Sequence, residues 1–328
     1  MKVKECIKRL YSQLPLENDA DVKESIFYKF INENFRTFID SVTQIDPDSL
    51  QEILRSDNEI EHFVEPYTKL RFIYCIKKIC KDLLRILALC YKGNLTDADK
   101  SLKKLLRSRC YGKYLVENYI ELFSFSLEKE KEYYRMRDEN KYDAKGCELV
   151  VDNCWHLPYQ KRASAFFGRY NLPGYPCLYL GDSKETCEAE LGRLDKERRW
   201  VGVFRLKKNI LLYDLRIPSE KTIDGANGYD LFRMLLTYPF IAICTVKSRV
   251  NGFNEEYFIP QLLFHQVLIA GNKETSHKGI VYSSTKYKGG YNIVLPALYT
   301  DKEPPVSGYS KILLEMFEQQ IPVIYKSK

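Results

Sequence analysis

The spacing of apolar residues divides the chain into two parts with different patterns. Up to about residue 130, apolar residues recur three and four positions apart, and glycine occurs only at Gly93 and Gly112. The clearest example is one apolar stripe, which consists of Phe72, Ile76, Ile79, Leu83, Ile86 and Cys90. This period is typical of helices that bury one face. The pattern therefore predicts a helical bundle over residues 1–130.

After residue 130 the pattern becomes mixed, and proline and glycine become frequent. Short runs of β-branched and aromatic residues predict strands at 176–180, 200–206, 210–215, 240–246 and 279–282. Helical spacing and capping residues predict helices at 184–197, 228–238 and 257–270. Such a mixture indicates an α+β domain over residues 131–328, with the charged segment 127–132 as the junction.

Composition and charge narrow the class of protein. An apolar content of 45% and an aromatic content of 13% argue for packed structure rather than disorder. The longest apolar helical stretch, 70–91, is interrupted by charged residues, so we expect no membrane span. The start of the sequence lacks the apolar core of a signal peptide, which favours a cytoplasmic protein. The net charge is +7 and lies mostly after residue 130, which suits a substrate with phosphates but falls short of a nucleic-acid-binding composition.

Metal and cofactor motifs are missing from the sequence. The ten cysteines stand mostly among apolar residues without any Cys-x-x-Cys, as buried reduced thiols do. The four histidines form no His-Glu-x-x-His, so we expect no metal site. There is also no Gly-x-Gly-x-x-Gly after a strand and no phosphate-binding loop, and we therefore expect no bound cofactor.

The most specific chemistry lies in the stretch 169–190. A turn at Pro173-Gly174 precedes the short strand at 176–180, and a helix follows directly. This order holds Arg169 and Glu190 on either side of one strand. Their side chains can therefore converge on a polar ligand.

The same stretch resembles the signature of the RES-domain family, which is named for an arginine, a glutamate and a serine. The matching residues are Gly168, Arg169, Tyr170, Asn171, Gly174, Pro176, Tyr179, Ser183, Thr186, Ala189 and Glu190. An aromatic-arginine strand at 133–137 and a serine motif at 279–285 also resemble the family. The register places the family's serine at Ser284, with Ser283 and Thr285 as alternatives. The resemblance covers roughly residues 132–296.

This resemblance implies an enzyme that cleaves the nicotinamide–ribose bond of NAD, by hydrolysis or phosphorolysis, and acts as a toxin or stress effector. It implies a fold similar to that of ADP-ribosyltransferase toxins, and NAD as a consumed substrate. The catalytic residues implied are Glu190, Arg169 and Ser284. The substrate-binding residues implied are Arg135, Tyr179, Tyr170 and Asn171. An antitoxin protein is the implied partner, while formation of a homo-oligomer is left open.

The residue types suit that reaction. Departure of nicotinamide leaves an oxocarbenium-like ribose, whose charge a carboxylate such as Glu190 stabilises. A guanidinium makes a forked contact to pyrophosphate or ribose, which suits Arg169 or Arg135. Tyr179 suits stacking on nicotinamide, and Ser284 suits orienting the ribose or the amide.

A second glutamate, Glu188, precedes Glu190 by two positions. Residues two apart on a helix point about 200° apart, so only one of the pair can face a given site. The family register selects Glu190.

Three other functions remain open from the sequence. The first is transfer of ADP-ribose to a protein or nucleic acid. The second is a non-catalytic NAD-binding or sensor protein. The third places the function in the helical part, which would contact RNA or an antitoxin through the basic residues near 77–81. The charge balance makes a nucleic acid the less expected partner.

Overall fold

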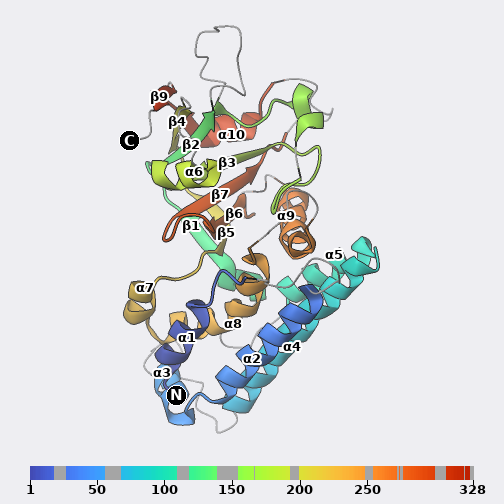
Figure 1. The fold of residues 1–328 in the computed structure, drawn as a ribbon, viewed down its shortest axis with the longest axis vertical. Coiled ribbons are helices and arrows are strands. Elements are labelled where there is room, and N and C mark those ends of the chain that lie inside the picture. The colour runs from blue at the N-terminus through green and yellow to red at the C-terminus, as the bar shows by residue number, and fades with distance from the viewer. Residues whose placement is uncertain are drawn as a thin grey trace. The chain divides into compact units, whose positions relative to one another are not determined.

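The computed structural model describes residues 1–17, 27–55, 68–108, 118–138, 154–165, 167–192, 199–247, 254–271, 273, 276–299, 308–320 and 322–325. The chain forms two compact units, and each contains two separate segments. The helical unit consists of Met1–Phe123 and Ile217–Leu263. The sheet unit consists of Ser124–Arg216 and Phe264–Lys328. Figure 1 labels most of the elements of both units.

The helical unit contains α1 (Val3–Tyr11), α2 (Phe27–Thr43), α3 (Pro47–Arg55), α4 (Thr68–Tyr91), α5 (Leu95–Leu106), α7 (Glu220–Gly225), α8 (Gly228–Cys244) and two 3₁₀ turns, Tyr119–Phe123 and Glu255–Tyr257. Helix α4 lies alongside α2 and α5 (Figure 1). The predicted stripe from Phe72 to Cys90 is buried, whereas Lys77, Lys78 and Lys81 are exposed. The predicted helical bundle is thereby confirmed for the described residues up to Phe123, whereas Ser124–Leu127, within the predicted range, forms a strand of the sheet unit. None of the helices in the described ranges is long and apolar enough to cross a membrane.

The segment Ile217–Leu263 belongs to the helical unit, although the sequence pattern placed it in the α+β domain. The strand predicted at 240–246 is wrong, because α8 continues through Pro239 as far as Cys244. From Leu231 onward nearly every residue of α8 is buried. A segment that is apolar on all sides has no period that separates a strand from a helix, so the packing decides.

The sheet unit contains β1 (Ser124–Leu127), β2 (Glu132–Asp138), β3 (Cys177–Gly181), β4 (Arg199–Leu206), β5 (Ile210–Leu215), β6 (Gly279–Ser283), β7 (Tyr291–Pro296), β8 (Phe317–Gln319) and β9 (Val323–Tyr325). Its helices are α6 (Lys184–Leu191), α10 (Lys311–Met316) and a 3₁₀ turn at Tyr159–Ser164, while α9 (Phe258–Ala270) begins in one unit and ends in the other. The nine strands follow the order β1-β5-β6-β7-β3-β2-β4-β8, and β9 pairs with β4. Only β5 and β6 pair in parallel among these strands. The predicted α+β class is confirmed.

Two sections of the sheet meet between β2 and β3. These strands pair at a single position, Tyr134 opposite Gly181, whereas β2 pairs with β4 along seven residues. Gly181 ends β3 and leads into α6. A Cβ atom at this position would lie 2.7 Å from the Sγ atom of Cys187, so glycine lets α6 pack directly on the strand.

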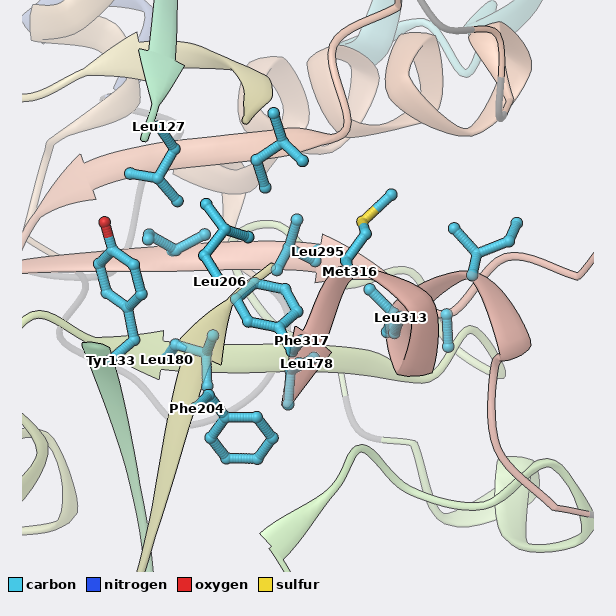
Figure 2. Close-up of a cluster of buried hydrophobic side chains, with 14 of the residues drawn as sticks. Leu127, Tyr133, Leu178, Leu180, Phe204, Leu206, Leu295, Leu313, Met316 and Phe317 are labelled. Carbon is cyan, nitrogen blue, oxygen red and sulfur yellow. The ribbon is translucent and has the colours of Figure 1, made fainter. Parts of the chain in front are cut away.

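A hydrophobic core fills one face of the sheet. Figure 2 shows Leu178 and Leu180 of β3 close to Phe204 and Leu206 of β4, with Met316 and Phe317 from the C-terminal part of the chain. The ring of Trp155 meets Phe204 edge-on at a centroid distance of 5.1 Å. Leu178 and Leu180 point into this core, so Tyr179 between them points to the opposite face of β3.

Two histidines, the buried His156 and the half-buried His277, make the stability of the sheet unit depend on pH. Burial lowers the pKa of His156 from 6.5 to about 4, and burial lowers that of His277 equally. His156 accepts a hydrogen bond at Nε2 from the amide of Ser310, while the His277 ring stacks on Tyr213. Both imidazoles are therefore neutral in the folded protein at pH 7.

Acidification should accordingly destabilise the sheet unit. The unfolded chain takes up protons on these histidines below pH 6.5, whereas the folded chain does so only near pH 4. The free energy of unfolding should fall by about 2 kcal/mol per histidine from pH 7 to pH 5. Denaturant unfolding at the two pH values measures this. His277→Phe, which keeps a ring against Tyr213, should show a smaller loss, and an unchanged loss would contradict the assignment.

Candidate functional site

The start of α6 is tied to strand β7 through Asp182. The Ser183 hydroxyl caps the helix by accepting a hydrogen bond from the Thr186 amide at 3.1 Å. Asp182 Oδ1 accepts hydrogen bonds from the Thr186 hydroxyl at 2.7 Å and from the Tyr291 amide at 3.0 Å. Ser183 and Thr186 therefore fix the start of the helix, and the helix in turn carries Glu190.

Glu190 lies in the last turn of α6 and receives two hydrogen bonds at one oxygen. Its Oε1 atom accepts from the hydroxyl of Ser284 at 2.7 Å and from the side-chain amide of Asn292 at 2.8 Å. These donors are 94 and 102 positions away in the sequence, and both are 7% exposed. Within the described ranges no hydrogen bond reaches Oε2. One oxygen is held by two donors, and the other accepts no hydrogen bond from the described residues.

The Ser284 hydroxyl has no hydrogen-bonding capacity left. It donates to Glu190 and accepts from the backbone amides of Lys286 at 3.1 Å and Tyr287 at 3.0 Å. A hydroxyl has one donor and two acceptor positions, and all three are used. In this arrangement Ser284 can act on a ligand only through Glu190. Of the three hydroxyls in the 283–285 motif, Ser284 is the one bonded to the glutamate.

The loop between β6 and β7 packs closely on α6. A Cβ atom at Gly290 would lie 2.2 Å from the Thr186 hydroxyl oxygen, so only glycine fits there. The carbonyl oxygen of Gly290 accepts a hydrogen bond from the Ser284 amide at 2.9 Å. Lys286 donates from Nζ to the backbone carbonyl of Glu190 at 2.7 Å, which satisfies an end carbonyl of the helix.

Glu188 points away from this cluster, as the helical spacing predicts. Its carboxylate pairs with Arg199 at 3.5 Å, and the side chain of Arg199 is 3% exposed. The two glutamates of α6 therefore have different partners.

Glu188→Gln should lower stability without altering chemistry at Glu190. The substitution removes the counter-charge of a buried guanidinium, which we expect to cost about 1–3 kcal/mol of unfolding free energy. Thermal and denaturant unfolding measure the loss. Any activity per folded molecule should stay within about twofold. A large activity loss in a stable Glu188→Gln protein would contradict this separation.

Tyr170, Tyr282 and Arg135 lie near Tyr179. Burial raises the pKa of the Tyr179 phenol well above its usual range, Tyr170 and Tyr282 raise it further, and the charge of Arg135 opposes this. The rings of Tyr170 and Tyr282 lie 4.7 Å apart. Arg135 and Tyr179 therefore lie close to each other, and their roles in binding a ligand stay predictions.

Arg169 lies in a tight turn, half-buried, between Gly168 and Asn171, whose backbones bond to each other at 3.2 and 3.3 Å. Asn171 is 4% exposed and braces the turn by donating to the Leu172 carbonyl at 3.3 Å. Tyr170 is fully buried. Among the described contacts, neither Arg169 nor Arg135 bonds to Glu190. The structure brings Glu190 and Ser284 together, and the roles of all the predicted site residues, these two included, stay predictions.

The sequence pattern did not predict two contacts of Glu190, which come from Asn292 and Lys286. The sequence signal for Asn292 is a single amide in the apolar run Tyr291–Leu295 of a buried strand, where polar side chains are rare. No group of three or more His, Cys, Asp or Glu residues in the described ranges is arranged to hold a metal ion.

Comparison with known proteins supports the grouping of these motifs. Residues 151–309 match the family model of the RES domain. A relative from Bacillus subtilis (strain 168), named "Putative toxin YopC", is 29% identical over 216 residues, which cover 60% of this chain and 46% of the relative. The chain thus spans about half the length of that relative. No solved structure matches the chain, so the likeness to ADP-ribosyltransferases stays a prediction. Over residues 151–309, a little under half of its length, this chain is therefore similar to the RES-domain family.

Proposed function

We propose that this protein is an enzyme that cleaves the nicotinamide–ribose bond of NAD and acts as a toxin or stress effector by depleting it. The observation that carries the proposal is the Glu190 carboxylate, which Ser284 and Asn292 hold by one oxygen. The match to the RES domain and the resemblance of the motifs to that family support NAD as the substrate. The name of the matched relative supports the role as a toxin, for which an antitoxin protein is the expected partner.

The chemistry follows from the charge on Glu190. As the bond breaks, its electron pair goes to the ring nitrogen of nicotinamide, which becomes neutral and leaves without a proton. Positive charge then develops on the ribose, and the carboxylate stabilises it through Oε2 and by holding a ribose hydroxyl. Water or phosphate attacks the cation and, in the case of water, releases a proton to solvent. The guanidinium of Arg169 or Arg135 suits the pyrophosphate.

NAD turnover with product identification tests the proposal. Purified protein is incubated with NAD, with and without phosphate, and nicotinamide is quantified by chromatography. Free ADP-ribose indicates hydrolysis, and its phosphorylated form indicates phosphorolysis. If wild-type protein releases no nicotinamide in either condition, the proposed reaction is wrong.

The same assay separates the alternatives. NAD labelled in its adenylate phosphate would leave label on a protein or nucleic acid if the activity is ADP-ribosyl transfer. Intact NAD together with measurable binding would indicate a sensor or binding protein.

A further inference from the structure

Asn292 occupies a position where the backbone cannot easily move. It lies on β7 between two partner strands, opposite Tyr282 of β6 and Gly181 of β3. Its side chain is buried and donates from Nδ2 to Glu190 Oε1 at 2.8 Å. A buried amide group needs an acceptor, and the carboxylate of Glu190 is the acceptor it has.

The carboxylate of Glu190 in turn needs donors where it stands. The last turn of a helix carries partial negative charge, so an acidic side chain there is disfavoured. Asn292 and Ser284 offset this by donating to the same oxygen, and Lys286 places an ammonium at the Glu190 carbonyl. Ser284 comes from a loop, whereas Asn292 comes from the interior of the sheet. The firmer of the two anchors is thus Asn292.

We propose that Asn292 is a positioning residue, which fixes Oε1 of Glu190 and thereby directs Oε2 toward the substrate. The role of Asn292 in catalysis rests on the proposed function. The interaction of its side chain with Glu190 does not depend on that proposal. Charged groups on the elements packed around Glu190 include the Lys286 ammonium at the carbonyl of Glu190, the Glu188–Arg199 pair of α6, and Asp182, which bonds to Thr186 of α6 and Tyr291 of β7. In the described part of the chain, none of these groups donates to the carboxylate oxygens of Glu190.

Asn292→Asp tests the coupling by replacing a donor with a second carboxylate of the same shape. Two carboxylates this close share one proton, so the pKa of the pair rises. While that proton is present the new aspartic acid donates to Glu190 as the amide did. As the pH rises through the pKa of the pair, the proton leaves and the two charges repel. The variant should therefore lose stability with rising pH relative to wild type.

The first readout is the unfolding temperature between pH 5 and pH 8, which needs no substrate. The unfolding temperature of Asn292→Asp should fall further below that of wild type as the pH rises. In the double variant Asn292→Asp with Glu190→Gln, a neutral amide replaces one of the two carboxylates. The difference between its unfolding temperature and that of wild type should therefore not change with pH. Equal pH slopes in the single and double variants would overturn the inference. A variant that folds at pH 5 but not at pH 8 supports it.

The second readout is NAD cleavage. Asn292→Asp should show activity that declines from pH 5.5 to pH 8, unlike wild type. Asn292→Ala, which removes the donor without adding charge, should lower kcat about tenfold with KM changed less than about twofold. Wild-type kcat in Asn292→Ala would overturn the positioning role. If wild type does not cleave NAD, the unfolding temperatures still decide the coupling, so the two failures are distinguishable.

Discussion

Glu190→Gln should lower the rate of NAD cleavage by about 10²–10³-fold and leave the fold intact. The amide oxygen of glutamine can accept the same two hydrogen bonds from Ser284 and Asn292 that Oε1 accepts. The substitution therefore removes the negative charge that stabilises the ribose cation and keeps the packing. Initial rates of nicotinamide release measure the first effect, and thermal unfolding measures the second.

The matched control is Glu185→Gln on the same helix. Glu185 is exposed in the first turn of α6, so the same change of charge occurs away from the cluster. Its activity should stay near that of wild type. Full activity in Glu190→Gln, or an equal loss in both variants, would show that the charge on Glu190 does not carry the reaction.

Gly290→Ala should both destabilise the sheet unit and reduce activity. The new Cβ atom would lie 2.2 Å from the Thr186 hydroxyl oxygen, and the loop that holds Ser284 must shift. Overpacking of this kind costs about 1–3 kcal/mol. A displacement of about 1 Å in a catalytic cluster lowers rates by about 10²-fold. Denaturant unfolding and NAD turnover measure the two effects.

Thr186→Ala provides the rescue. It removes both Thr186 atoms that the new methyl group meets, and the remaining neighbour is the ring of the exposed Tyr287, which can rotate away. Combined with Gly290→Ala it should recover part of the lost stability and activity, so that the two substitutions are not additive. Strict additivity would mean that the contact between the loop and α6 is not what requires glycine.

The parts of the fold that the sequence predicted are those fixed by local patterns. The apolar stripe of α4 has a helical period, and β5 has the predicted bounds Ile210–Leu215. The second half of α8 could not be assigned, because its apolar run is buried on all sides and passes through Pro239. Its membership of the helical unit depends on partners far away in the chain.

The candidate site shows the same division between local and distant information. Glu190 and Ser284 could be selected because each lies in a motif with many spaced matches. Asn292 is 102 positions from Glu190, and only the register of β7 against β3 and β6 brings the two together. The saturation of the Ser284 hydroxyl depends on the conformation of its loop, which sequence spacing does not specify.

The alternation of the two units along the chain limits how the protein can be divided for study. The chain passes between the units after residues 123, 216 and 263, so no single cut separates them. A fragment that starts at Ser124 would still contain α8 but would lose its partners, such as the hydroxyls of Tyr11 and Tyr119 that bond to α8 carbonyls. Its apolar surface would then face water and favour aggregation. An isolated sheet unit therefore requires removal of residues 217–263 and a short replacement linker, rather than a simple truncation.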